Sequence, residues 1–456
     1  MSRRNIIDLL IIDQEPLNLP FILSCVEHQH RVYWFKGDPK TNNMDIGNNF
    51  DPTNKKIIPV SNWVPYISKV DLTIACDNGK YIDKLDAFKK KGFKIYSPSV
   101  KSANLEIQRK DGLDFMKAHN IDVPKYHEFA TLNEARKFLM KDKGRYVIKL
   151  LGDEDDKSLT YLSKTSSDML EHFDWMEHNK KIPKDSFILQ EYVKGIEFAI
   201  SAWMGSKGFI GLPCESVEHK ALCAGDVGPS TGEQGTLSKY TSKSKLFDEL
   251  LKPLEKDLTA FGHLSNIDIN SIIDEKGKVW PLEFTARFGY PAWQLNQQQH
   301  ETKDQAQWML DACNGKNTLK QNEDHGICVV INVPPYPFDK DQLDERALDR
   351  PIYGYDDTPA IRSRVQPQMV KIDKTIVQDG KSGAIKKRWN WKTAGSYVAI
   401  VNGFGDSITQ SQERVYDTIK KLWIPGIYYR NDIGKRFVEE QLEPLQKLGF
   451  AESWRK

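Results

Sequence analysis

The sequence predicts an α/β protein, with a doubly wound parallel α/β region first, an α+β region in the centre and a β-rich region last. Three observations support this prediction. The chain has 456 residues, a length that suits two to four domains. Short apolar runs alternate with helical patterns over about the first hundred residues, and closely spaced strands with hairpin turns come later. We expect domains over residues 1–103, 104–320 and 325–456.

The first region repeats a strand–helix–strand pattern. A helical pattern over 81–91 places Ile82, Leu85 and Phe88 on one face, and Pro98 and Ser99 end the region. Repetition at this spacing predicts a parallel, doubly wound sheet. The strands expected there cover residues 6–12, 31–35, 56–59, 71–76 and 94–97.

The later regions are richer in hairpin signals. Asp274–Gly277 is a good hairpin turn, because Gly277 can take the positive φ that such a turn needs. The strands expected beyond residue 104 cover 146–150, 187–193, 197–203, 266–273, 278–284, 326–333 and 396–401. The helices expected there cover 103–119, 132–142 and 433–448. The chain shows no internal repeat.

Composition excludes several classes of protein. The chain has 65 basic and 63 acidic residues, so it gives no strong nucleic-acid or membrane-surface signal. Its six cysteines form no CxxC pair and no zinc spacing, which suits a reducing compartment. No apolar segment approaches the roughly 20 residues that span a bilayer, and Asp8 interrupts the apolar run near the N-terminus, unlike a signal peptide. We expect a cytoplasmic protein without a membrane partner.

The most informative strand covers residues 281–289, Pro-Leu-Glu-Phe-Thr-Ala-Arg-Phe-Gly. Alternation places Glu283, Thr285 and Arg287 on one face. A carboxylate, a hydroxyl and a guanidinium there could hold Mg²⁺ and neutralise a phosphoryl group. Asn270, on the facing strand of the same hairpin, could supply a second oxygen. For such a strand alone, a surface ion pair is the commoner explanation.

Two further strands end in polar residues. Residues 187–191 lead into a turn through Gly195, where backbone groups could read an adenine edge and Glu197 could accept from ribose hydroxyls. A solvated loop is the commoner reading of that segment. Lys149 ends another apolar strand, where a lysine usually extends to solvent along the surface but can also act as a point charge for phosphates.

Residues 218–235 hold four glycines, a proline and several hydroxyl side chains. This composition predicts a loop whose backbone amides approach a ligand, and a plain turn explains it equally well. The segment is not a phosphate-binding loop of the GxxxxGK[ST] type, and GxGxxG occurs nowhere in the chain.

Taken in chain order, these motifs resemble the ATP-grasp ligases, and specifically the phosphoribosylamine–glycine ligase family. Residues 218–235 are similar to that family's DHK…GDxGPNTGGMG, and residues 282–292 to its LEFNxRFGDPE. Residues 429–434, Tyr-Arg-Asn-Asp-Ile-Gly, are similar to its YRxDIG, and residues 120–129 to its GIPxxxYxxF. The likeness is colinear over nearly the whole chain, and it implies a central ATP-grasp fold.

The resemblance implies a reaction in two steps. ATP phosphorylates a carboxylate to an acyl phosphate, and an amine then attacks it to form an amide. The cofactors implied are ATP and Mg²⁺, with Mn²⁺ as an alternative ion. The partners are small molecules, with glycine or another small amino acid as the expected carboxylate.

The resemblance also implies roles for single residues. Glu283 would ligate the metal, with Thr285 standing where the family has asparagine, and Arg287 would stabilise the transferring phosphoryl group. The expected nucleotide contacts are Lys149 with Arg109 or Lys110 at the phosphates, Glu191 and Val193 at the adenine, and Glu197 at the ribose. The expected contacts of the carboxylate substrate are Asp226, Gly228, Pro229, Thr231 and Arg287.

The chain departs from the family where the amine should bind. The family's first strand ends in a glycine-rich, phosphate-binding turn, whereas here Asp13 and Glu15 would repel a phosphate. Residues 76–80 and 290–292 differ as well, and the loop at 152–158, expected over ATP, carries four acidic residues. We therefore expect an altered amine substrate. Authentic phosphoribosylamine–glycine ligase and a non-catalytic nucleotide-binding scaffold remain as alternatives.

Overall fold

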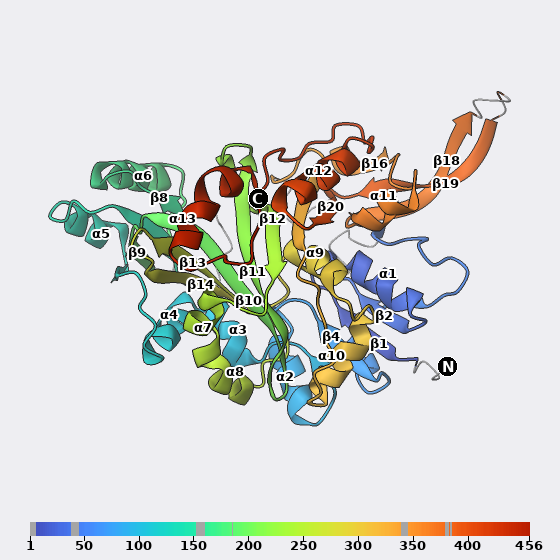
Figure 1. The fold of residues 1–456 in the computed structure, drawn as a ribbon, viewed down its shortest axis with the longest axis horizontal. Coiled ribbons are helices and arrows are strands. Elements are labelled where there is room, and N and C mark those ends of the chain that lie inside the picture. The colour runs from blue at the N-terminus through green and yellow to red at the C-terminus, as the bar shows by residue number, and fades with distance from the viewer. Residues whose placement is uncertain are drawn as a thin grey trace.

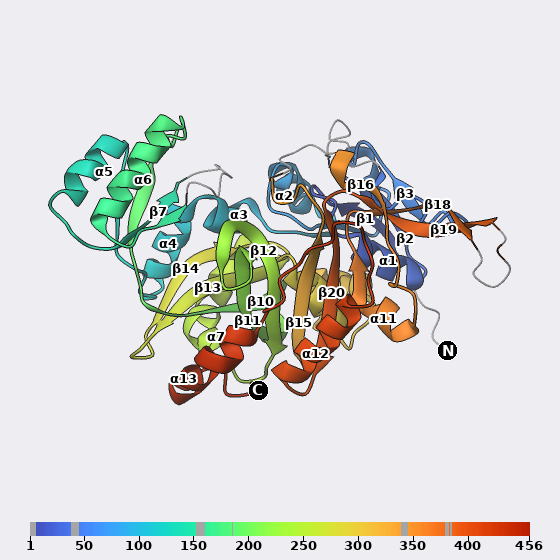
Figure 2. The ribbon, with the colours of Figure 1, turned by 90° about the horizontal axis from the view of Figure 1, so that it is seen from above.

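The computed structural model describes residues 6–37, 45–151, 160–184, 186–338, 345–378, 383 and 385–456. It has the predicted α/β architecture, with a parallel sheet near the N-terminus and antiparallel sheets later. Figure 2 shows the N-terminal sheet at one end, helices α5 (Leu132–Leu139) and α6 (Ser166–His178) at the other, and the largest sheet between them.

The N-terminal sheet is parallel, as the sequence predicts. Its order is β3-β2-β1-β4-β5, so the chain turns back between β1 and β4. In such sheets, ligands bind at the carboxyl ends of the strands beside this switch point. The elements are β1 (Asp8–Ile12), α1 (Leu19–Glu27), β2 (Arg31–Phe35), β3 (Ile57–Pro59), β4 (Leu72–Ala75), α2 (Ile82–Lys90) and β5 (Ile95–Tyr96).

The predicted helix over 103–119 is wrong in one respect, because the chain forms two helices there. Helix α3 (Val100–Ile107) ends at Gln108, whose φ of −99° and ψ of 83° are not helical, and α4 (Arg109–Ala118) follows. The break changes the chain direction so that Glu106 and Arg109 both face the same cavity. A helical pattern continues through such a break, so the sequence does not reveal it.

A small antiparallel sheet follows, in the order β6-β9-β7-β8. Helices α5 and α6 supply apolar side chains to its core, among them Leu139 and Phe173. Its strands are β6 (Tyr126–Phe129), β7 (Tyr146–Leu150), β8 (Tyr161–Leu162) and β9 (Phe187–Glu191).

The largest sheet has the order β14-β13-β10-β11-β12-β15-β20-β17. It runs across the boundary expected at 320–325, because Gly235–Ser238 of β12 pair with residues 326–329 of β15. Its strands are β10 (Gly195–Gly205), β11 (Gly208–Cys223), β12 (Val227–Tyr240), β13 (Asn266–Asp274), β14 (Val279–Thr285), β15 (His325–Asn332), β17 (Val365–Pro367) and β20 (Tyr397–Gly405).

The loop predicted over 218–235 is wrong: the segment is a β-hairpin of β11 and β12 that turns at 224–226. Two of its glycines explain why the composition misled. Gly225 takes a φ of 74° in the turn. A Cβ on Gly235 would lie 2.6 Å from the carbonyl oxygen of Cys328, so this glycine allows β12 to pair with β15.

The remaining elements cover the large sheet and extend beside it. Helix α12 (Ile408–Ile419) packs on β15 and β20, and the hairpin of β18 (Val370–Gln378) and β19 (Ile385–Ala394) projects from the body (Figure 1). The helix expected over 433–448 is π-helical at Phe437–Gln441 and continues as α13 (Leu442–Lys447). The other elements are α7 (Lys245–Leu250), α8 (Glu255–Phe261), α9 (Ala292–Gln299), α10 (Gln305–Cys313), β16 (Leu348–Pro351), α11 (Pro359–Arg364) and short 3₁₀ turns at Val64–Tyr66, Lys252–Leu254 and Glu345–Ala347.

Among the described helices, none combines the length and the apolar character needed to cross a membrane.

Candidate active site

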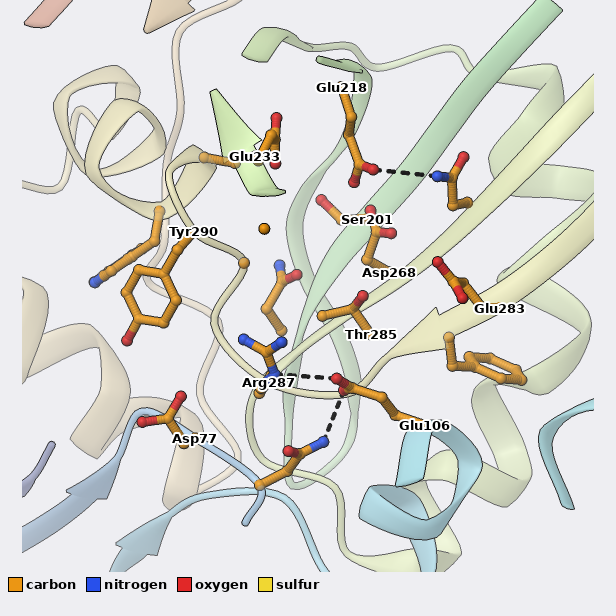
Figure 3. Close-up of a pocket in the computed structure, with 18 of the residues that line it drawn as sticks. Asp77, Glu106, Ser201, Glu218, Glu233, Asp268, Glu283, Thr285, Arg287 and Tyr290 are labelled. Atoms are coloured by element: carbon orange, nitrogen blue, oxygen red, sulfur yellow. Dashed lines mark hydrogen bonds and ion pairs between the residues drawn. The ribbon is translucent and has the colours of Figure 1, made fainter. Parts of the chain in front are cut away.

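A cavity of about 1160 Å³, here called the central cavity, lies where the three regions meet. Its floor is one face of the large sheet from β14 to β12. Gln14 and Asp77 line it from the carboxyl ends of β1 and β4, and Tyr336 and Tyr397 line it from the C-terminal region. Figure 3 shows the acidic and basic side chains that face this space.

The β13–β14 hairpin brings the predicted metal residues into this cavity. Asn270 pairs with Glu283, and all of Asn270, Glu283, Thr285 and Arg287 line the cavity. Glu283 Oε2 accepts a hydrogen bond from Arg109 Nη1 at 2.8 Å. Burial alone would raise the pKa of Glu283, but the charges of Arg109 and its neighbouring lysines outweigh burial and hold that pKa well below its usual range. Glu283 is therefore a carboxylate at neutral pH.

Asn270 presents an oxygen that fits a metal ion. Its Nδ2 donates to Glu197 at 2.6 Å and to Glu218 at 3.1 Å, while its buried Oδ1 has no hydrogen-bond partner among the described residues. Mg²⁺ takes oxygen ligands and commonly shares its shell with phosphates and water. The described residues contain no group of three or more His, Cys, Asp or Glu side chains that could hold an ion. Asn270 Oδ1 and the carboxylate of Glu283 fit a shared site of this kind.

Arg287 is held in the cavity by a residue that the sequence did not reveal. Arg287 Nε donates to Glu106 Oε1 at 3.1 Å, and Glu106 Oε2 accepts from Asn78 Nδ2 and from the backbone N–H of Ala286, both at 2.7 Å (Figure 3). The charge of Glu106 raises the pKa of Arg287 above its usual value. Glu106 lies on α3, far from Arg287 in the sequence, and belongs to no motif that could have marked it.

Two lysines bring positive charge near Glu283 of the β13–β14 hairpin. Lys149 on β7 is buried, and burial, reinforced by Arg109, lowers its pKa to about 7. Lys220 on β11 lies 3.0 Å from Glu218, 3.3 Å from Glu197 and 3.8 Å from Glu283. Lys220 stands in the EHK part of the glycine-rich motif, a signal from which it could have been predicted as a site residue.

Several predicted nucleotide residues lie elsewhere. Arg109 lines the cavity, but Lys110 pairs with Glu128 at 2.8 Å on an exposed surface, because consecutive helical residues point in different directions. Glu191 and Val193 are not among the described residues that line the cavity. Glu197 lies beside it through its contacts with Asn270 and Lys220. The acidic loop at 152–158 lies outside the described residues.

The predicted substrate residues at the β11–β12 turn are not among the described residues that line the cavity. Asp226 pairs with Arg430 Nη1 at 2.8 Å, and Gly228 and Pro229 are exposed at the hairpin end. Thr231 is buried and donates to the carbonyl oxygen of Lys220 at 2.8 Å. The hairpin end is thus anchored to the Tyr-Arg-Asn-Asp-Ile-Gly segment rather than open to the cavity. Sequence similarity alone could not distinguish anchoring from substrate contact.

Replacing Arg430 with methionine is expected to lower the free energy of unfolding by about 2–3 kcal/mol. Arg430 is 1 % exposed and also pairs with Asp432 at 2.8 Å, so its loss removes the buried cation that two carboxylates share. Asp226 is 43 % exposed, which keeps the loss below that of a fully buried pair. Urea unfolding followed by circular dichroism would measure it. The control is Arg436→Met, which removes an exposed partner of the same Asp226 and should cost less than about 1 kcal/mol; equal losses would contradict the anchoring role.

The end of the cavity beside β1 and β4, where an amine site is expected, is acidic, with one correction to the sequence prediction. Asp13 does not line the cavity: it is buried, accepts from Asn18 Nδ2 at 2.7 Å and from Trp34 Nε1 at 3.1 Å, and burial raises its pKa to about 8. Glu15 and Asp77 do line it. Burial raises the pKa of Asp77 to about 6. Asp13 lies beneath the cavity wall because it follows β1 directly and bonds to the start of α1.

Comparison with known proteins agrees with this arrangement. The ATP-grasp (A) domain of phosphoribosylglycinamide synthetase matches residues 110–292. The phosphoribosylamine–glycine ligase of Clostridium acetobutylicum is 26 % identical over 382 residues, covering 81 % of this chain and 85 % of that protein. The enzyme of the same name from Salmonella typhimurium is 25 % identical over 390 residues, covering 82 % and 85 %.

Two solved structures share the fold. The crystal structure of phosphoribosylamine–glycine ligase from Thermotoga maritima superposes with a TM-score of 0.67 at 17 % identity, covering 93 % of this chain and 99 % of that one. The L-amino acid ligase of Bacillus licheniformis gives a TM-score of 0.57 at 14 % identity, covering 93 % and 99 %. ATP-grasp ligases use ATP and a divalent metal ion. The chain carries an ATP-grasp (A) domain at residues 110–292 and is similar over most of its length to the phosphoribosylamine–glycine ligases, enzymes that form C–N bonds.

Proposed function

We propose that this protein is an ATP-dependent carboxylate–amine ligase that forms an amide through an acyl phosphate. Its carboxylate substrate is glycine or another small amino acid, its ion is Mg²⁺, and its amine differs from phosphoribosylamine. The observation that carries the proposal is the β13–β14 hairpin, which presents Glu283, Asn270 and Arg287 to one cavity.

The charges around this hairpin suit phosphoryl transfer. Mg²⁺, when bound at Glu283 and Asn270, would supply charge neutralisation at the phosphates. Arg287 offers a planar guanidinium to the transferring group, and Glu106 fixes its orientation before substrate binds. Arg109 lines the cavity and can meet the remaining phosphate charge, and Lys149, which is not among the lining residues, is near enough for its charge to act on Glu283. The protein thus contributes orientation and electrostatic stabilisation, which dominate catalysis of phosphoryl transfer.

The amine end supports a substrate without a phosphate group. Glu15, Asp77 and Asp83 line this edge of the cavity and outnumber the cations Lys80 and Arg287 there. Asp77 Oδ2 is buried and has no hydrogen-bond partner within the described ranges. A phosphate placed here would meet carboxylates instead of the backbone amides and positive charges that bind such groups. The names of the relatives favour one second candidate, authentic phosphoribosylamine–glycine ligase activity.

An ADP-release assay tests the proposal. Purified protein with ATP and Mg²⁺ would be given glycine or other small amino acids, each with a panel of unphosphorylated amines or with phosphoribosylamine. We expect ADP only when acid and amine are both present, together with a product whose mass is that of the amide. Efficient turnover of glycine with phosphoribosylamine would overturn the altered amine site. ATP binding without ADP release under any combination would favour the non-catalytic scaffold.

Binding of ATP is expected to take up close to one proton at pH 8 and almost none at pH 6. Lys149, with a pKa of about 7, is mostly neutral at pH 8 in the empty site and becomes charged beside the phosphates. At pH 6 it is already protonated, so nothing is taken up. Titration calorimetry in buffers of different ionisation enthalpy measures the uptake. Lys149→Met should abolish the difference between pH 6 and pH 8; an unchanged difference would exclude Lys149 as its source.

A further inference from the structure

The part of the central cavity over β10 to β13 is unusually polar for the face of a buried sheet. We call it the inner chamber and define it by Ser201, Ser216, Glu233, Thr236, Ser238 and Asp268, all of which line the cavity. Asp268 pairs in register with Ser201 on one side and with Thr285 on the other. Figure 3 shows Glu233, Ser201 and Asp268 on the same side of the sheet as Arg287.

Two carboxylates of the inner chamber are not balanced by a cation of the described residues. Lys220 is already shared among Glu197, Glu218 and Glu283. Asp268 is 9 % exposed, and its buried Oδ1 has no hydrogen-bond partner in the part of the chain that the structure describes. Glu233 is 8 % exposed and accepts a hydrogen bond from the hydroxyl of Thr236. Burying two carboxyl groups without a cationic partner is costly, and a ligand that brings a positive charge offsets this cost, so their retention in a cavity points to a cationic ligand.

An ammonium group fits this surrounding. It carries one positive charge and three donors. Asp268 and Ser201 pair in register on adjacent strands and can accept from it together, while Glu233, on β12 further across the sheet, adds negative charge to the same chamber. The family motif that residues 218–235 resemble has glycine where Glu233 stands, so Glu233 is a carboxylate that the motif lacks.

We propose that Asp268 accepts hydrogen bonds from the ammonium group of the carboxylate substrate, that Glu233 attracts that group by its charge, and that the two carboxylates so select aminocarboxylates over hydroxy acids and unsubstituted acids. The inference rests on the proposed function, because it assumes that the other end of the substrate is activated beside Arg287. Thr285 ends β14 two residues before Arg287 and pairs with Asp268 on the adjacent strand. Neighbouring strands lie about 4.8 Å apart, a separation that a short aminocarboxylate spans with its carboxylate toward Arg287 and its ammonium toward Asp268.

Matched pairs of acids test the proposal by direct binding. Glycine and β-alanine would be compared with glycolate, 3-hydroxypropionate and acetate, with Mg²⁺ and a non-hydrolysable ATP analogue present, by titration calorimetry. We expect the amino compounds to bind at least about 100-fold more tightly, because an analogue without the ammonium leaves the buried carboxylates unpaired. Asp268→Asn and Glu233→Gln, each of nearly unchanged shape, should each reduce that preference about tenfold or more.

The control is Glu215→Gln. Glu215 is also a buried carboxylate of β11, but its oxygens accept from Ser244 at 2.7 Å and from Trp454 at 2.7 Å, away from the cavity. This variant should keep the full preference for glycine over glycolate. Circular dichroism would show whether each variant is folded. If Asp268→Asn does not fold, the binding preference of Glu233→Gln tests the proposal.

Three results would overturn the proposal. Glycolate could bind as tightly as glycine, the two chamber variants could keep the full preference, or Mg²⁺ alone could stabilise the wild type but not Asp268→Asn, which would make the chamber a metal site. A failure of the proposed function looks different. In that case no pair of substrates releases ADP, while the preference for glycine over glycolate and its loss in the variants persist.

Discussion

Replacing Arg287 with methionine is expected to lower kcat by about 10³-fold or more while ATP binding weakens less than about tenfold. An arginine that stabilises the charge of a transferring phosphoryl group contributes on the order of 10³ to 10⁵ in rate. Arg287 lines the cavity beside Thr285 and Glu283 and is oriented by Glu106 before substrate arrives. Its contribution should therefore be made mainly in the transition state rather than in ground-state binding.

The measurement is single-turnover ADP formation, with the ATP dissociation constant measured separately by calorimetry. Arg287→Lys is the informative second variant. A lysine keeps the positive charge but cannot reproduce the planar fork that holds both Glu106 and a phosphoryl oxygen. We expect it to recover at most about tenfold of the lost rate. A methionine variant with kcat within tenfold of the wild type would contradict the role given to Arg287.

A variant of Glu106 distinguishes the effect of the orientation of Arg287 from the effect of its charge. Glu106→Gln leaves Arg287 charged but weakens the hydrogen bonds that fix it. The rate should fall less than in Arg287→Met, and the double variant Glu106→Gln with Arg287→Met should be no slower than Arg287→Met alone, because the two act through one group. If the rate losses of the two single variants multiplied in the double variant, Glu106 would act independently of Arg287.

Much of the fold could be predicted because it depends on local patterns. The buried strands of the N-terminal sheet are short apolar runs with turn residues between them, and β2 and β7 have the predicted bounds. The β11–β12 hairpin could not be recognised, since its glycines serve close packing against β15 as much as turning. The two-helix break at Gln108 likewise depends on tertiary contacts that no periodicity records.

The residues of the candidate site likewise fall into those that local patterns predict and those that tertiary packing places. Glu283, Thr285 and Arg287 could be placed together because strand alternation is local. Glu106 and Asp268 reach the cavity from other elements, and the sequence gives no sign that they meet Arg287. Asp226 shows the opposite case, because its motif was recognised while its partner Arg430, more than two hundred residues away, was not. Motifs indicate which segments matter, and the packing of distant segments decides what each residue does.

Replacing Glu283 with glutamine is expected to lower kcat by about 10³-fold at a fixed Mg²⁺ concentration and to raise the concentration of Mg²⁺ needed for half-maximal rate. A bound metal contributes several kcal/mol of charge stabilisation, and glutamine removes the negative charge that attracts the ion. Steady-state rates over a series of Mg²⁺ and Mn²⁺ concentrations would measure both effects. Glu275→Gln, in the exposed turn of the same hairpin, is the matched control and should leave both unchanged.

Binding of ATP without metal provides the sharper test of Glu283. In the wild type, the carboxylate of Glu283 offsets the charges of Arg109, 2.8 Å away, and Lys220, 3.8 Å away. Removing that carboxylate leaves these cations free for the phosphates, so metal-free ATP should bind as tightly as in the wild type or more tightly. The gain in affinity that Mg²⁺ confers should shrink at the same time. A variant that loses metal-free ATP binding but keeps the full Mg²⁺ effect would mean that Glu283 organises the cationic side chains and does not hold the ion.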